Sequence, residues 1–428
     1  MNRRAFLKTS GTSALGLAVL GASPPSASAQ ATTPIWLNTL FHGGDARAME
    51  IMVEKLNKEQ KVFRVDLTQG GWTEYYAQLH NAVAAGVAPN IGICHNFQFI
   101  QSHPVFYPLN DTPAGDVLKQ KGWSKADFIP AAWDFAQVGG VQYGIPLDQN
   151  MAGLYYNKAI FKQAGLDPSK PPKNRQEFET AAEAIKKTGK LAFHPAFNSP
   201  PRWIRRSWYM LHWSAGGRLI DETGKKAAFN TKTGLETLTY LADMVGKRGW
   251  NKPGTDANKQ FLAGELGMCY NGTWFYLTLD SAPTIDYGCA PVPNWFGTQV
   301  TWGTTHNLVL PKQPKGKAHE DKLRVTVDAL AALVSNTLLW GEFSGHVPMY
   351  KKALDDPRLR GSKTWQKTLG VFYEMAFGGV FRTYDAHPKI VEFNAAVEPH
   401  IQEAYNGTVT PKEALTRAER DGNATLAG

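Results

Sequence analysis

Alternating strand and helix patterns open the chain after its first thirty residues. Apolar residues cluster or alternate over residues 34–40, 62–68 and 91–94, as they do in strands. Between these segments, apolar residues recur at helical spacing in two stripes: Met49, Met52, Val53 and Leu56, then Tyr76, Leu79 and Val83. This β-α-β-α-β order predicts an open, mainly parallel sheet with helices on its faces.

Three loops of this region are predicted to leave the same edge of the sheet. They comprise residues 42–45, 70–73 and 95–98, each following a predicted strand. In open parallel sheets ligands bind beyond the carboxyl ends of the strands. The first two loops carry paired glycines and start helices, whose N-terminal amides favour oxygen-rich ligands. We expect Asp45 to cap the first of these helices and expect a binding site at this edge.

The rest of the chain continues with helical patterns over residues 178–187 and 235–245 and a helix-turn-strand over 261–274. A chain of 428 residues is too long for one ordinary core, so two domains are expected. Its proline-rich stretches are too short for a flexible linker between domains. The chain is therefore expected to cross between two lobes several times in short segments.

The N-terminus resembles an export signal of the twin-arginine type. Paired arginines at Arg3 and Arg4 precede Phe6-Leu7-Lys8, an apolar run covers residues 14–20, and small residues end at Ala29. Residues 1–29 are therefore predicted to be a signal peptide, removed on export of the folded protein to the periplasm. Neither this run nor any later segment has the roughly 20 apolar residues of a membrane-spanning helix, so the mature protein is expected to be soluble or peripheral. No cysteine stands near the cleavage site, so a lipid anchor is not expected.

Charge and cysteine usage narrow the function classes. The formal charge of +9 falls by three to +6 when the signal peptide leaves, and the remaining basic residues are scattered. Nucleic-acid binding would need a basic stripe, which is not visible.

The cysteines Cys94, Cys269 and Cys289 have no metal-ligand spacing. We favour buried free thiols, although Cys269 and Cys289 could form a disulfide if their strands were neighbours. No metal site and no cofactor are predicted.

Several blocks, in the expected order, resemble family 1 extracellular solute-binding proteins, the maltodextrin-binding-protein-like receptors of ABC importers. The blocks are Ala88-Pro89-Asn90-Ile91 (with Asn90 where the family usually has Asp), residues 143–148 (YGIPLD), 154–158 (LYYNK), 261–268, 271–274 (NGTW) and 398–415. No single block is decisive, but together they cover nearly the whole mature chain.

This resemblance implies a two-lobed periplasmic-binding-protein fold of type II-like topology, with mainly parallel sheets flanked by helices and joined by hinge segments. It places residues 32–148 and 299–345 in the N-terminal lobe and residues 149–298 and 346–428 in the C-terminal lobe. It also implies a monomer that closes over a small solute and delivers it to a membrane permease and its ATPase.

By position in the family, the resemblance also implies the residues that line the cleft. These are His42, Asp45, Trp72, His95, Asn96, Asp148, Asn150, Trp203, Trp274, Trp302, Gly303, Thr304, His306, Arg382 and Tyr384. Flat rings can stack on the C–H face of a pyranose, and charged rim groups can hydrogen-bond its hydroxyls. The resemblance therefore favours a carbohydrate or polyol as the solute. The competing interpretation is structural: the tryptophans could pack in the lobes, and Asp148, His95 and His306 could be hinge partners.

Other functions remain open alternatives. Arg202, Arg205, Arg206 and Arg382 could serve a glycerol-phosphate-type or other anionic solute. The adjacent pair Tyr155 and Tyr156 could suggest ferric iron, but neighbouring strand residues point to opposite faces. A polyamine would need more carboxylates. A secreted carbohydrate-active enzyme is the remote alternative, because the chain has no HExxH, GxSxG, Walker or GxGxxG motif. We therefore predict no catalytic residues.

Overall fold

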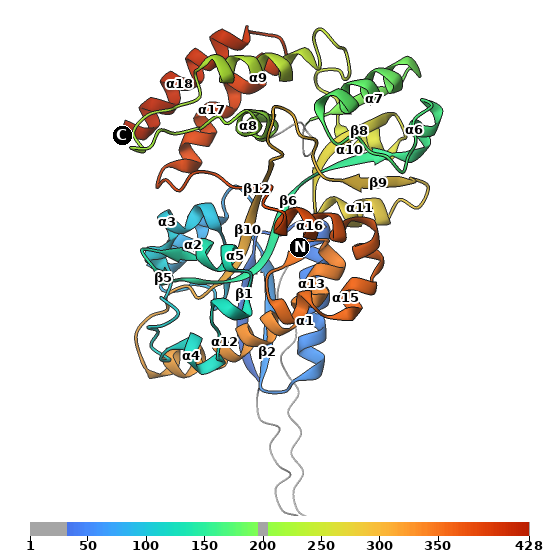
Figure 1. The fold of residues 1–428 in the computed structure, drawn as a ribbon. Coiled ribbons are helices and arrows are strands. Elements are labelled where there is room, and N and C mark those ends of the chain that lie inside the picture. The colour runs from blue at the N-terminus through green and yellow to red at the C-terminus, as the bar shows by residue number, and fades with distance from the viewer. Residues whose placement is uncertain (1–31, 196–203, 428) are drawn as a thin grey trace, which may run out of the picture.

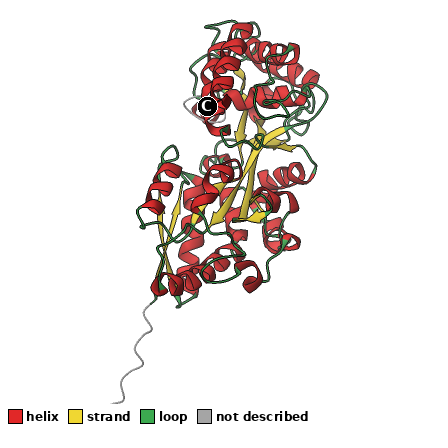
Figure 2. Ribbon diagram, turned by 90° about the vertical axis from the view of Figure 1, so that its left-hand side faces the viewer, coloured by secondary structure: helices red, strands yellow, loops and turns green. Residues whose placement is uncertain are grey.

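The computed structural model describes residues 32–195 and 204–427, which form two lobes joined by long strands (Figure 1). The predicted signal peptide and the candidate site residue Trp203 lie outside the described residues. A view at right angles shows strands running through both lobes with helices around them (Figure 2). The fold is therefore the expected two-lobed α/β architecture.

The N-terminal lobe is built from an initial run of elements and a second run that returns after residue 316. The first run comprises β1 (Thr33–Thr39), α1 (Gly44–Glu59), β2 (Phe63–Gln69), α2 (Tyr75–Ala84), β3 (Gly92–His95), α3 (Phe99–Ser102), α4 (Val117–Lys121), α5 (Pro130–Phe135), β4 (Gln137–Val138) and β5 (Val141–Gln142). The second run comprises α12 (Lys317–Ser335), α13 (Thr337–Ser344), β11 (Val347–Pro348), α14 (Lys351–Leu354) and α15 (Pro357–Gly361), with α16 (Gly370–Phe377) beside the junction.

The C-terminal lobe holds the middle and the end of the chain. Its elements are α6 (Lys158–Gln163), α7 (Arg175–Lys187), β7 (Leu191–His194), α8 (Ile204–Ser214), α9 (Lys232–Asp243), α10 (Ala257–Leu262), β8 (Leu266–Gly272), α11 (Phe275–Asp280), β9 (Tyr287–Ala290), β12 (Phe381–Arg382), α17 (Ile390–Tyr405) and α18 (Pro411–Ala427). The helices and strands predicted from apolar spacing are all present, with ends shifted by a few residues.

Two long strands, β6 (Gly144–Asn157) and β10 (Thr301–Val309), connect the lobes. The first half of β6 pairs antiparallel with β10 and β11, and its second half pairs antiparallel with β8 and β9. β10 pairs with β3 at one end and with β12 at the other. Every residue of both strands is buried. The outer pairs β1–β2 and β7–β8 are parallel, as expected, whereas the connecting strands make the sheet mixed.

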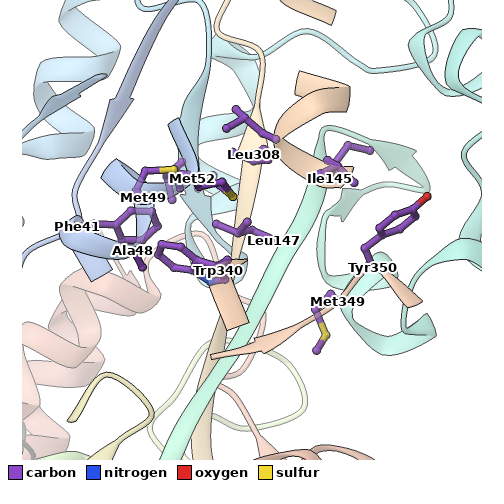
Figure 3. Packing of buried hydrophobic residues seen from close by; sticks show 14 of the residues in the cluster. Phe41, Ala48, Met49, Met52, Ile145, Leu147, Leu308, Trp340, Met349 and Tyr350 are labelled. Carbon is purple, nitrogen blue, oxygen red and sulfur yellow. The ribbon is translucent and has the colours of Figure 1, made fainter. Parts of the chain in front are cut away.

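The alternation of side chains along β6 divides its residues between two cores. Met151 and Tyr155 belong to the apolar core of the N-terminal lobe and the junction, while Leu154 and Tyr156 belong to the core of the C-terminal lobe. Because successive strand residues point to opposite faces, one strand can anchor both cores. Figure 3 shows the first core, where Phe41 and Trp340 pack together beside the connecting strands.

The segment after residue 345 packs on the N-terminal lobe. β11 pairs with β6 at Asp148 and Gln149, and the backbone N–H of Ile129 donates to the carbonyl of Met349 at 3.0 Å. The expected division assigned residues from 346 onward to the C-terminal lobe. We propose that the N-terminal lobe extends through α15.

The alternative disulfide between Cys269 and Cys289 is wrong. Both residues face Tyr155 of β6, Cys269 from β8 and Cys289 from β9 on the other side. Two strand spacings, about 9.5 Å, therefore separate them, which exceeds the roughly 7 Å limit between the Cα atoms of a disulfide. All three cysteines are free.

The expected N-cap role of Asp45 is also wrong. Helix α1 begins at Gly44, its N-cap is Gly43 with a φ of 57°, and Asp45 lies in the first turn. A positive φ suits glycine, which has no Cβ. The Asp45 carboxylate is instead 3.2 Å from His346.

Within residues 32–195 and 204–427, no single helix has the length and apolar character needed to cross a membrane. Helices α12 and α13 meet that test only as a pair, bent by 48° at the break between them.

Candidate functional site

A buried polar cluster lies where the connecting strands leave the N-terminal lobe, and we name it the acid–imidazole cluster. It consists of Asp148 on β6, His306 on β10, His346 between α13 and β11, and Asp45 on α1. Nδ1 of His306 and Nδ1 of His346 each lie 2.9 Å from the same Asp148 oxygen, Oδ2. The indole N–H of Trp340 donates to that oxygen at 2.7 Å. Asp148 therefore joins the connecting strands to the segment after α13.

Charge explains why this cluster is stable although it is buried. Burial alone would raise the pKa of Asp148, but the charges and hydrogen bonds of His306 and His346 lower that pKa to well below its usual range. Burial lowers the pKa of His346, whereas Asp45 and Asp148 raise it, and the net shift is upward. Asp148 is therefore ionised and His346 is its cationic partner, since opposite charges at hydrogen-bond distance favour both charged forms.

A strip of rings extends from this cluster in both directions. Successive ring centroids lie 5.1 Å apart for Trp72 and His95, 4.6 Å for His95 and His306, and 5.6 Å for His306 and His346. Trp274 of the C-terminal lobe follows at 6.4 Å from His346. The three histidines are buried, whereas Trp72 is 38% exposed and Trp274 is partly exposed. The two accessible ends of the strip thus belong to different lobes.

A second polar cluster, the arginine–tyrosine cluster, lies on the C-terminal side of the junction. It consists of Arg205 and Arg206 on α8, Tyr384 after β12, and Glu398 on α17. Nε of Arg206 donates to the Tyr384 hydroxyl at 3.0 Å, and its guanidinium carbon lies 3.7 Å from the centre of the Trp302 ring. Arg205 forms an ion pair with Glu398 at 3.0 Å.

The arginine–tyrosine cluster is built around positive charges, whereas the acid–imidazole cluster is built around a buried carboxylate. Burial would raise the pKa of Tyr384, but the positive charges of Arg206 and Arg205 outweigh it and lower that pKa. Burial lowers the pKa of Arg206, which nevertheless stays charged because a free guanidinium has a pKa above 12. The C-terminal side of the junction therefore carries buried positive charge against aromatic rings.

The remaining predicted site residues are distributed around these two clusters. His42 is exposed, and Arg382 lies over the ring of Trp213, with its guanidinium carbon 4.9 Å from the ring centre. Asn150 accepts a hydrogen bond from the Thr304 hydroxyl at 3.2 Å, and both residues are buried.

Gly303 was expected to line the cleft. In the structure its backbone is packed tightly, because a Cβ there would lie 2.4 Å from the carbonyl oxygen of Asn150 and 2.6 Å from the ring of Phe381. This glycine therefore permits the close approach of β6 and β10.

The two lobes touch on both sides of the connecting strands. Nδ2 of Asn96 donates to the Thr383 hydroxyl at 3.0 Å, and Nε2 of Gln101 lies 2.9 Å from both oxygens of Glu392. On the other side, Gly44 faces Leu277 so closely that a Cβ would lie 3.0 Å from Cδ1. Loops of the N-terminal lobe therefore meet helices and loops of the C-terminal lobe.

Sequence reasoning missed His346 and Trp340, which complete the acid–imidazole cluster. Neither lies in a block that resembles the family, and no short spacing links them to Asp148, since 158 residues separate Asp148 from His306 and 198 separate it from His346. Arg206 was considered only for an anionic ligand. His346 and Trp340 come close to Asp148 only because the chain returns to the N-terminal lobe after β10. No local sequence pattern reveals this return.

Comparison with known proteins agrees with this architecture. A family model described as bacterial extracellular solute-binding protein matches residues 42–319. The sn-glycerol-3-phosphate-binding periplasmic protein UgpB of Escherichia coli (strain K12) is 22% identical over 448 residues, covering 98% of this chain and 97% of UgpB.

Solved structures share the fold at lower identity. Maltose-bound MalE3 of T. maritima superposes with a TM-score of 0.78 at 16% identity, covering 91% of this chain and 99% of MalE3. UgpB of Mycobacterium tuberculosis in complex with glycerophosphocholine gives 0.76 at 16% identity, covering 93% and 98%. Because the family model spans more than half of the chain, the protein belongs to the bacterial extracellular solute-binding proteins, and it is a solute-binding component of an ABC importer.

Proposed function

We propose that the protein captures a carbohydrate, either a mono- or oligosaccharide or a polyol, between its two lobes. The observation that carries this proposal is the ring strip, whose accessible ends, Trp72 and Trp274, belong to opposite lobes. Indole faces stack on the C–H faces of pyranose rings and release poorly held water. A solute in contact with both ends would favour the closed arrangement of the lobes.

Groups around the strip can supply hydrogen bonds to hydroxyls. Asp45 keeps 14% of its side chain exposed, His42 is exposed, and Asn96 is partly exposed at the contact between the lobes. Charged and amide groups of this kind bind sugar hydroxyls as donors and acceptors. The maltose-bound neighbour supports a carbohydrate by its fold and its bound sugar.

An anionic solute of the glycerol-phosphate type is the second candidate. The arginine–tyrosine cluster supports it, because Arg206 brings positive charge to the junction beside Trp302. UgpB of Escherichia coli, named for sn-glycerol-3-phosphate, aligns over nearly the whole chain, and the Mycobacterium tuberculosis UgpB structure holds glycerophosphocholine.

We further propose that the protein works as a monomer in the periplasm, after export by the twin-arginine pathway, and hands its solute to a permease with its ATPase. No catalytic step is proposed, since the family consists of binding proteins. The solute would leave the protein chemically unchanged.

A thermal-shift panel of sugars, polyols and glycerol phosphates tests the ligand class. Binding to the folded form alone stabilises it by about 2.7 kcal/mol at a ligand concentration of 100 Kd. The proposal expects stabilisation by at least one neutral carbohydrate. Stabilisation by anions alone would instead establish the glycerol-phosphate alternative.

Substitution of Trp274 tests the location of the site. Trp274→Ala is expected to abolish the ligand-induced shift while leaving the melting curve without ligand nearly unchanged. Trp123→Ala is the matched control, because Trp123 is also partly buried but follows α4 at the far end of the N-terminal lobe (Figure 1). A large loss of stability without ligand would assign Trp274 to the core.

A further inference from the structure

The acid–imidazole cluster contains the donor set of a metal site. One ligand atom from each of Asp148, His306 and His346 lies within 4.8 Å of the others, and all three side chains are buried. They come from β6, from β10 and from the segment between α13 and β11, so the fold itself brings them together. Two imidazoles and one carboxylate that converge on one point are a common ligand set for divalent transition metals.

The neighbours of these three groups resemble the outer shell of a metal site. His346 turns Nδ1 toward Asp148, and its other ring nitrogen, Nε2, lies 3.2 Å from Oδ1 of Asp45. Metal-bound histidines usually have a carboxylate or carbonyl at the second nitrogen, which fixes the ring and its tautomer. The indole N–H of Trp340 holds the Asp148 carboxylate at 2.7 Å in the same way.

The contact between His346 and Asp45 supports this interpretation. Although Nε2 and Oδ1 are 3.2 Å apart, neither atom makes a hydrogen bond of good geometry. Buried polar atoms in native proteins are nearly always satisfied. A small shift of the His346 ring on binding a cation at Nδ1 could align Nε2–H with Asp45.

We propose that Asp148, His306 and His346 bind one divalent transition-metal ion of the Zn²⁺ class at the junction of the lobes, with Asp45 as a positioning residue. Such an ion would link the segment after α13 to both connecting strands, β6 and β10. Sequence reasoning predicted no metal, because the three donors do not form a short motif. A cation bound at both Nδ1 atoms takes the place of their hydrogen bonds to Asp148.

The first test uses the mature protein stripped with chelator and titrated with Zn²⁺. We expect one equivalent to bind, with release of protons that appears as a dependence of the titration heat on the ionisation enthalpy of the buffer. Co²⁺ is expected to give visible absorption bands from the bound ion. Failure of the wild-type protein to bind one equivalent of either ion would overturn the proposal, whatever the variants do.

Variants assign the ion to this cluster. His346→Gln is expected to lose at least 100-fold in Zn²⁺ affinity, and Asp45→Asn, which leaves the three ligands in place, is expected to lose 10- to 100-fold. His212→Gln is the matched control, because His212 is a buried histidine of the C-terminal lobe that contacts the carbonyl of Arg218 at 3.1 Å. It should bind Zn²⁺ like the wild type. Equal binding by His346→Gln would place the ion elsewhere and refute the site. Solute binding is measured separately, so the two proposals can fail independently.

Discussion

The two polar clusters at the junction are built around opposite charges. The acid–imidazole cluster surrounds one buried carboxylate, Asp148, with four N–H groups, whereas the arginine–tyrosine cluster packs Arg205 and Arg206 against rings with Glu398 as their acidic partner. The first links both connecting strands to the segment after α13, and the second links α8 to the segment after β12 and to α17. The comparison indicates that the acid–imidazole cluster stabilises the junction, whereas the arginine–tyrosine cluster supplies positive charge to it.

The largest effect is expected from removing the charge of Asp148. Asp148→Asn leaves the cationic His346 without its fully buried partner, and breaking a buried pair in this way costs about 3–5 kcal/mol. Denaturant unfolding should report this loss. The control Asp134→Asn affects a surface pair with Lys125 in which both side chains are half exposed, and should cost less than about 1 kcal/mol. A loss as small as that of the control would mean that Asp148 does not hold the junction.

Loss of the acidic partner on the other side should cost less. Glu398→Gln removes the charge that faces Arg205, but Glu398 is 24% exposed, and water can compensate in part. We therefore expect a loss of about 2 kcal/mol in the free energy of unfolding. A loss greater than that of Asp148→Asn would reverse the comparison and make the arginine–tyrosine cluster the main support of the junction.

Two buried histidines, His194 and His212, should make the C-terminal lobe sensitive to acid. Burial lowers the pKa of each to about 4, although a backbone carbonyl beside each ring, and Asp256 in the case of His194, partly oppose this shift. In the unfolded chain their pKa is about 6.5. Between these values the unfolded chain binds protons that the folded chain does not, so the stability contributed by the neutral rings is complete above pH 6.5 and falls as the pH drops.

The size of this effect can be measured by denaturant unfolding at pH 7 and pH 5. Each histidine should contribute about 2 kcal/mol of lost stability over this interval. In His212→Gln the contribution of that residue should vanish, leaving a smaller difference between the two pH values than in the wild type. The same pH dependence in both proteins would show that His212 is protonated in the folded state.

The smallest effect is expected at the contact between the lobes. Asn96→Ala removes the hydrogen bond to Thr383, and a partly exposed hydrogen bond contributes about 0.5–1.5 kcal/mol. Its removal should leave global unfolding nearly unchanged and increase hydrogen exchange of the loop after β3. Unchanged exchange would mean that this contact does not hold the lobes together.

Much of the fold could be predicted from local patterns. The stripe from Met49 to Leu56 is buried on α1, and the strand expected over residues 34–40 is β1. These patterns succeed because apolar spacing reports directly which face of an element is buried. The antiparallel pairing of β6 and β10 could not be read in this way, since fully buried strands have no alternation of polar and apolar residues.

The candidate site was only partly predictable. Asp148 ends a block that resembles the family, and both Asp148 and His306 were placed in the cleft by their position in the family, but their mutual contact was not predicted. His346 was missed because its role depends on two contacts in space, with Asp148 and Asp45. Gly303 was named as a residue that lines the cleft, and the structure adds a reason for a glycine there, because the close packing of two strands leaves no space for a Cβ.

Calorimetric titration of the wild-type protein with the solutes of the thermal-shift panel tests the central claim most directly. If two lobes hold a solute between them without altering it, one neutral carbohydrate will bind saturably with a stoichiometry of one, and Trp274→Ala will not bind it. A panel in which nothing binds, or a heat signal that continues after saturation as turnover would produce, would contradict the account.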